Sequence, residues 1–327
     1  MKIKNILNIN STFIVCLYSI FFTSLACAQT ETSTENNIMY DIPITTLNGK
    51  KITLNDYVGK KPVYLKFWAS WCQPCKKQMP HLQKTFEAYG DIVEVIAVNL
   101  GINDNLEEIQ TVQKEFSLTV PFAIDHSGEL SQAFNMIGTP YHILIDMEGN
   151  IVFKGHDASA QLDRTIKLLS SSKSNFLPNL PMEKTIVQSA LVDTQENKIT
   201  ALFFTATWCD WYLEESRPAM SKNCIDGQKQ VNMLYMDNPT FNWVGIVSRL
   251  WTSDKELKEY KNKYQIEHFL AIDTSDQEFI KYNVKTFPTL ILFKEGKEIF
   301  RTSDFSNSSK LSNRINDLQN IKQDKLR

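Results

Sequence analysis

Cys72 and Cys75 are the residues of this chain whose types and spacing most directly suggest chemistry. They follow an apolar run, Val63–Trp68, and precede a helix-competent segment, so the pair is expected where a strand passes into a helix. Cys72 would then lie at the helix N-terminus, where free backbone N–H groups and the helix dipole favour a thiolate. Cys75 would lie one turn further on, within disulfide reach. The pattern predicts a redox dithiol with Cys72 as the nucleophile and Cys75 as the resolving cysteine.

Other roles for this cysteine pair fit the sequence less well. A structural zinc site needs four ligands, and no second pair of cysteines or histidines stands at ligand spacing. A c-type haem attachment needs a histidine where Lys76 stands, and a peroxiredoxin-like site needs Thr or Ser in place of Ala69. A plain structural disulfide is the remaining alternative, which the strand, the helix and Pro74 at its start disfavour. The five histidines are scattered, so we predict no metal site and no cofactor.

The segment from Phe67 to Cys75, followed by Met79-Pro80, resembles the active-site segment of the TlpA, ResA and CcmG branch of thioredoxin-like proteins. The resemblance covers most of residues 40–170. It implies a thiol-disulfide oxidoreductase that is membrane-tethered or periplasmic.

The same resemblance implies three residues that bind substrate. Pro140, in the sequence Gly138-Thr139-Pro140, would be the cis-proline that faces the dithiol. The backbone of Thr139 would then pair with an extended substrate, and Trp71 would offer an apolar shelf for docking it.

Two lysines are candidates for tuning the thiolates. Lys76 adds positive charge directly after the motif. Lys66 stands six residues before the nucleophile, where classical thioredoxins have a buried acid. It would favour a thiolate if charged or act as a base if burial lowered its pKa, and the alternative is a packed stem with the amine in solvent. The ResA-like branch has an acid at the place of Ile102, so that part of the family's site is expected to be absent.

The N-terminus has the pattern of an export signal. Two lysines precede an apolar stretch at residues 13–22, and small and polar residues follow. We predict a signal peptide over residues 1–28, with cleavage after Ala28 favoured over lipidation at Cys27, and an uncleaved anchor as the third alternative. Either cleavage gives a periplasmic or otherwise extracytoplasmic protein.

Length and composition predict a globular protein of two domains. The chain has 327 residues, of which 43% are hydrophobic and 22% charged. Its net charge of -2 argues against nucleic acid as a partner. The sequence also repeats itself, as the following pairs of segments show: residues 67–72 and 204–209, 122–125 and 270–273, 136–140 and 284–288.

This repeat predicts an α/β protein of two tandem thioredoxin-like domains, each a central mixed β-sheet flanked by helices. Domain one is expected at residues 29–172 and contains the intact dithiol motif. Residues 173–183 are the predicted linker, in which two prolines interrupt regular structure. Domain two is expected at residues 184–327 and has Pro288 in the place of Pro140.

Domain two lacks a resolving cysteine, because Tyr212 stands three residues after Cys209. A mixed disulfide at Cys209 would not be released by the usual intramolecular attack. A straight helix from Cys209 to Cys224 would hold the two roughly 22 Å apart, unless Pro218 kinked it. We expect a monothiol site or a retired site kept for binding rather than a disulfide between these cysteines. Residues 225–240 are extra chain of unassigned function.

The functional hypothesis is an exported disulfide reductase that acts on protein substrates. The family resemblance implies that a membrane electron donor of the DsbD or CcdA kind reduces it, and that it serves apocytochrome c or another periplasmic protein. Alternatives are a disulfide oxidase or isomerase, and a client-binding assembly factor in which domain two docks the partner. Redox direction, substrate, donor and oligomeric state do not follow from the sequence.

Overall fold

The structure is a computed structural model that describes residues 39–171, 180 and 198–320. The predicted signal peptide with Cys27, and all of the predicted linker except Leu180, lie outside the described residues. In the part of the chain that is described, no helix is long and apolar enough to cross a membrane.

Domain one is built on a five-stranded mixed sheet with the order β5-β4-β3-β6-β7. β3, β4 and β5 run parallel, whereas β6 and β7 are antiparallel to their neighbours. Every residue of the central strand β3 is buried, as expected for an apolar run in the middle of a sheet. The strands are β3 (Val63–Trp68), β4 (Glu94–Asn99), β5 (Phe122–Ile124), β6 (Tyr141–Ile145) and β7 (Ile151–Gly155), with a separate hairpin of β1 (Ile44–Thr45) and β2 (Lys51–Ile52).

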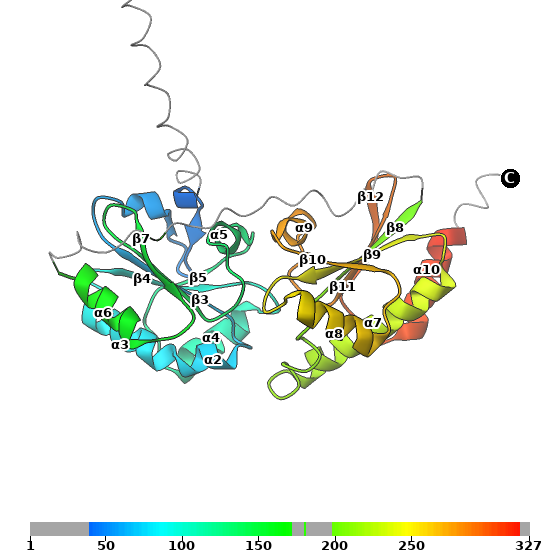
Figure 1. The fold of residues 1–327 in the computed structure, drawn as a ribbon, viewed down its shortest axis with the longest axis horizontal. Coiled ribbons are helices and arrows are strands. Elements are labelled where there is room, and N and C mark those ends of the chain that lie inside the picture. Colours follow the sequence, from blue (N-terminus) through cyan, green and yellow to red (C-terminus); the bar gives the residue numbers. More distant parts are fainter. Residues whose placement is uncertain (1–38, 172–179, 181–197, 321–327) are drawn as a thin grey trace, which may run out of the picture.

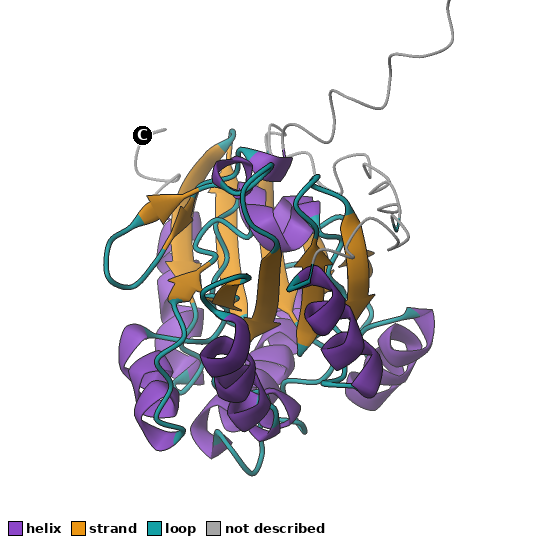
Figure 2. Ribbon diagram, turned by 90° about the vertical axis from the view of Figure 1, so that its left-hand side faces the viewer, coloured by secondary structure: helices purple, strands orange, loops and turns teal. Residues whose placement is uncertain are grey.

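Helices flank this sheet on both sides (Figures 1 and 2). They are η1 (Leu54–Asp56), α2 (Gln73–Lys77), α3 (Met79–Tyr89), α4 (Leu106–Glu115), α5 (Glu129–Ala133) and α6 (Ala160–Leu169). Leu162, Ile166 and Leu169 of α6 are buried, because their spacing places them on one helix face.

Domain two repeats this architecture beside domain one (Figure 1). Its sheet has the order β10-β9-β8-β11-β12, with the same pattern of parallel and antiparallel pairs. The elements are β8 (Ile199–Thr205), α7 (Pro218–Asp237), β9 (Asn242–Ser248), α8 (Asp254–Tyr264), β10 (Phe269–Asp273), α9 (Gln277–Lys281), β11 (Thr289–Lys294), β12 (Lys297–Thr302) and α10 (Ser308–Asn320). The predicted α/β fold class is confirmed.

The repeat extends to the way a short helix begins in each domain. Asp125 follows β5 and accepts hydrogen bonds from the backbone N–H groups of Gly128 and Ser131 at the start of α5. Asp273 ends β10 and accepts bonds from the N–H groups of Glu278 and Phe279 in α9. Each carboxylate satisfies amides that have no partner within the helix, which explains why both segments place an aspartate there.

Helix α7 differs from the expectation. Pro218 is its first residue and not a kink, because a proline at this position needs no intrahelical N–H bond. α7 continues through Gly227 to Asp237, so it contains most of the extra segment at residues 225–240. A Cβ atom at Gly227 would lie 2.6 Å from Cγ of Pro288. The glycine therefore lets α7 pack directly on the loop that contains Pro288.

This packing predicts the effect of Gly227→Ala. The added methyl group has no room against Pro288 and Phe305, so we expect the free energy of unfolding to fall by about 1–3 kcal/mol, despite the better helix propensity of alanine. Urea denaturation measures the change. The matched control is Lys229→Ala, an exposed position of the same helix, with an expected effect within about 0.5 kcal/mol. Equal stability of the two variants would contradict this account of α7.

Candidate active site

Cys72 and Cys75 lie where β3 passes into α2, as predicted. Cys72 is the N-cap residue of α2 and its Sγ accepts a hydrogen bond of 3.2 Å from the backbone N–H of Cys75. The two cysteines form a disulfide with their Cα atoms 5.2 Å apart. Both residues are 0% exposed, so the pair is shut off from solvent in this structure.

The loop before β6 has the geometry that the family resemblance implied. The peptide bond between Thr139 and Pro140 is cis. The imidazole Nδ1 of His156 donates a 2.8 Å hydrogen bond to the carbonyl of Pro140, which fixes the loop from the side of β7. Thr139 is buried, and its hydroxyl has no hydrogen-bond partner among the described residues.

Lys66 is buried on β3 and its amine does not reach solvent. Its Nζ donates a 2.9 Å hydrogen bond to Oε1 of Gln78, the residue between α2 and α3. Burial lowers the pKa of the Lys66 amine to about 7, because the ammonium form loses its hydration. This lysine can therefore release or take up a proton near neutral pH.

His142 completes the buried network around Gln78. Burial, followed by the charge of Lys66, lowers the pKa of His142 to about 2, so its ring is neutral. Nε2 lies 2.9 Å from Oε1 of Gln78 and Nδ1 lies 2.7 Å from the hydroxyl of Tyr64. Because the amide oxygen can only accept, Nε2 holds the proton and Nδ1 accepts from the tyrosine. One glutamine oxygen thus receives bonds from both Lys66 and His142.

Asp104 is a buried acid that the sequence analysis missed. The position of Ile102 was expected to leave the site without an acid, but Asp104, two residues later, accepts bonds from the backbone N–H of Ser70 at 2.8 Å and from Asn99 at 2.7 Å. Burial raises the pKa of its carboxyl, while these bonds and Arg217 act in the opposite direction. Asp104 thereby holds the turn that leads into the dithiol motif.

Domain two packs directly on this face of domain one. The indole rings of Trp71 and Trp208, which occupy equivalent places before Cys72 and Cys209, stack with centroids 4.8 Å apart. Each indole also donates a hydrogen bond to a carbonyl of its own domain, Trp71 to Ile102 at 2.7 Å and Trp208 to Leu250 at 2.8 Å. The expected shelf at Trp71 is therefore occupied by domain two.

The backbone contacts across this interface are reciprocal. The N–H of Asn103 donates to the carbonyl of Lys285 at 2.8 Å, and the N–H of Trp251 donates to the carbonyl of Ile137 at 2.9 Å. Asn103 and Trp251 follow equivalent strands and both have positive φ, 51° and 49°. Ile137 and Lys285 each stand three residues before the cis-proline of their domain. The interface thus has the character of a two-fold contact between like surfaces.

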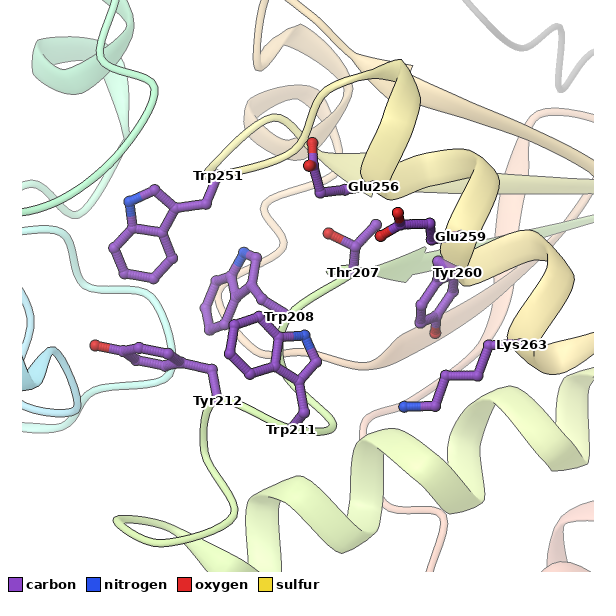
Figure 3. A pocket seen from close by; sticks show the side chains of 9 residues that line it. All are labelled: Thr207, Trp208, Trp211, Tyr212, Trp251, Glu256, Glu259, Tyr260 and Lys263. Carbon is purple, nitrogen blue, oxygen red and sulfur yellow. The ribbon is translucent and has the colours of Figure 1, made fainter.

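Tyr212 lies on this interface rather than beside Cys209. Its hydroxyl accepts a 3.2 Å hydrogen bond from the backbone N–H of Gln73, next to Cys72. Figure 3 shows Tyr212 and Trp251 pointing from domain two towards domain one, at one end of a cavity of about 560 Å³. Trp211, also at this cavity, is 59% exposed.

Arg217 adds an ionic contact between the domains. Its guanidinium forms an ion pair with Glu108 of α4 and lies 3.5 Å from the carboxylate of Asp104. It also donates a hydrogen bond to the hydroxyl of Ser70. Domain two therefore contacts the dithiol motif through Arg217 as well as through its aromatic residues.

Cys209 and Cys224 form a disulfide with Cα atoms 6.1 Å apart, contrary to the preferred monothiol interpretation. The straight helix assumed between them does not exist, because residues 210–216 form turns and α7 begins only at Pro218. The chain therefore folds back and brings Cys224 on α7 to Cys209. Both cysteines are buried.

The remaining candidate residues lie further from the dithiol chemistry. The ammonium of Lys76 forms a 2.8 Å ion pair with Glu115, which directs its charge to α4. Pro288 is preceded by a cis peptide bond and packs on α7. In the described ranges, no group of three or more His, Cys, Asp and Glu side chains is placed to hold a metal ion.

The buried amine predicts a pH-dependent difference between the wild type and Lys66→Met. The pKa of Lys66 is about 7 in the folded chain, below its ordinary value of 10.5, so between these values the unfolded chain binds more protons. The stability of the wild type relative to the variant should therefore rise from pH 7 to pH 10, by roughly 2–4 kcal/mol. Urea denaturation of both proteins at several pH values measures this. Parallel pH profiles would contradict the assigned pKa.

Several known proteins are similar to this chain. The AhpC/TSA family model matches residues 36–154. The thiol-disulfide oxidoreductase ResA of Bacillus thuringiensis subsp. konkukian is 35% identical over 130 residues, which are 39% of this chain and 73% of that protein. ResA of Bacillus subtilis is 30% identical over 142 residues, 42% of this chain and 76% of the relative. The crystal structure of StoA from Bacillus subtilis is 29% identical, covers 38% of this chain and 94% of that one, and has a TM-score of 0.34. The chain belongs to the ResA-type thiol-disulfide oxidoreductases of the thioredoxin-like superfamily.

Proposed function

We propose that this protein is an extracytoplasmic disulfide reductase that uses Cys72 and Cys75 on protein substrates. The observation that supports this most is the position of the pair, with Cys72 as the N-cap of α2 and Cys75 in its first turn. There the first amides of the helix favour a thiolate on Cys72 over one on Cys75.

The reaction requires two thiol-disulfide exchanges. The Cys72 thiolate attacks one sulfur of a substrate disulfide, forms a mixed disulfide with it and releases the other substrate sulfur as a thiolate. The Cys75 thiolate then attacks Sγ of Cys72, forms the Cys72–Cys75 disulfide and releases the second substrate thiolate. The substrate gains two electrons, and the cysteine pair is left in the disulfide form seen in the structure.

Lys66 is suited to serve the second exchange. Cys75 must lose its proton before it attacks, and an amine with a pKa near 7 accepts a proton readily at neutral pH. Gln78, three residues after Cys75, accepts a hydrogen bond from the Lys66 amine. In this proposal Lys66 takes the place of the buried acid of classical thioredoxins.

A dithiol donor must return two electrons to the pair after each turnover. A membrane donor of the DsbD or CcdA kind and substrates such as apocytochrome c belong to this proposal through the family resemblance. The export pattern at residues 1–28 supports an extracytoplasmic, periplasmic location. In that compartment the pair is oxidised unless a donor keeps it reduced.

A second candidate function is client binding by domain two. The cavity of about 560 Å³ beside Trp208 and the exposed Trp211 favour it. In that case the protein is chiefly an assembly factor, and the dithiol turns over rarely.

Trapping of mixed disulfides at Cys72 distinguishes the reductase function from the client-binding function. In cells that express the full chain with Cys75→Ser, the mixed disulfide at Cys72 cannot be resolved, so adducts with client proteins should accumulate on non-reducing gels. Mass spectrometry identifies the linked cysteine. Cys209→Ser added to Cys75→Ser should leave the adducts unchanged, and Cys72→Ser added to it should abolish them.

The redox state in the same cells indicates the direction. Acid quenching and alkylation of the wild type should find Cys72 and Cys75 mostly reduced. A mostly oxidised pair would favour the oxidase alternative, and an absence of adducts through Cys72 under turnover would favour the client-binding function.

A further inference from the structure

Trp251 of domain two lies on the loop of domain one that contains the cis-proline. Its backbone N–H donates a 2.9 Å hydrogen bond to the carbonyl of Ile137, three residues before Pro140. Its backbone has φ of 49°, a conformation that is rare for a bulky residue. Domain two thus holds Trp251 against this loop in the way that a bound ligand would be held.

The loop is shaped to receive the indole of Trp251. A Cβ atom at Gly138 would lie 2.4 Å from Nε1 and 2.6 Å from Cδ1 of that ring. Any side chain at position 138 would therefore exclude an indole from this place. The absence of a side chain at Gly138 creates a slot of aromatic size next to the cis-proline.

Aromatic contacts seal the slot towards the dithiol motif. The Trp251 ring lies 5.8 Å from Trp71, 5.2 Å from Trp208 and 5.2 Å from Tyr212, measured between ring centroids. On the other side of Trp251 is a cavity of about 630 Å³ that Thr139 and His156 also line. Thr139 thus lines this cavity, while its buried hydroxyl has no hydrogen-bond partner among the described residues.

We propose that Trp251 is an internal occupant of the client site of domain one, and that the clients present an aromatic side chain that displaces it. This inference rests on the proposed function. The client segment enters along the cavity at Thr139, places its aromatic ring over Gly138 and gives its backbone N–H to the carbonyl of Ile137. Because Trp251 packs on Trp71 and on Tyr212, which contacts the N–H of Gln73 beside Cys72, its displacement also loosens the packing of domain two on the dithiol motif.

The energetics of this exchange are balanced. An aromatic contact stabilises beyond the area that it buries, and a backbone hydrogen bond adds to this stabilisation. A client with an aromatic residue replaces the contacts that Trp251 loses, whereas a client without one leaves them unmade. The slot therefore discriminates between clients while it protects the dithiol in their absence.

The test measures how fast dithiothreitol reduces the Cys72–Cys75 disulfide in the full chain, with mass spectrometry to separate this bond from Cys209–Cys224. Trp251→Ala should raise the rate about tenfold, since loss of about 1.4 kcal/mol of closing contacts corresponds to that factor. Gly138→Ala, which expels the indole without removing it, should also raise the rate. Phe269→Ala is the matched control, because this aromatic side chain of domain two is 56% exposed and its removal should leave the rate unchanged.

Addition of a small amide in place of the missing Trp251 side chain identifies the class of ligand that the slot binds. N-acetyl-tryptophanamide should slow the reduction of the Trp251→Ala protein, whereas N-acetyl-leucinamide should not. An unchanged rate in folded Trp251→Ala and Gly138→Ala proteins would overturn the proposal, and equal slowing by both amides would overturn the aromatic specificity. Equilibration of the wild type with glutathione tests separately whether the Cys72–Cys75 pair is redox-active. A pair that does not respond to glutathione would contradict the proposed function, whatever the result for Trp251.

Discussion

The stacking of Trp71 on Trp208 joins the two domains at the surfaces where their first cysteines lie. Beside this contact, two equivalent backbone hydrogen bonds join the domains, one from Asn103 to Lys285 and one from Trp251 to Ile137. A repeat in the sequence places similar residues at equivalent positions of the two domains. Similar surfaces can then associate through a two-fold contact. Here the contact is made within one chain, which buries the dithiol of domain one.

Burial inside domain one explains the properties of two groups on its central strands. Lys66 and His142 lie in a region from which water is excluded, so both lose their charged forms more easily than in solution. Gln78 accepts hydrogen bonds from both and connects them to the helix that begins with the dithiol motif. The two domains differ at the equivalent site. Domain one has the two-cysteine motif, whereas in domain two Tyr212 contacts Gln73 of domain one and Cys209 pairs with Cys224.

Much of the fold could be predicted because its signals are local or repeated. The β3 strand and the dithiol at its end follow from short motifs, and the second sheet follows from the repeat. The cis-proline at Pro140 follows from the family resemblance. The Cys209–Cys224 disulfide could not be predicted, because it depends on the turns at residues 210–216, for which helix periodicity gives no signal. Asp104 was missed because its role depends on the fold of the loop after β4. The packing of domain two on Trp71 was missed because contacts between domains leave no periodic pattern in the sequence.

Hydrogen exchange at two amides tests the packing of the domains most directly. The N–H groups of Asn103 and Trp251 lie in loops, and each donates to a carbonyl of the other domain. In the oxidised full chain we expect both amides to exchange slowly and with similar protection, because both are released only when the domains separate. Exchange of either amide at the rate of an unprotected loop would show that the dithiol face of domain one and the equivalent face of domain two do not pack together.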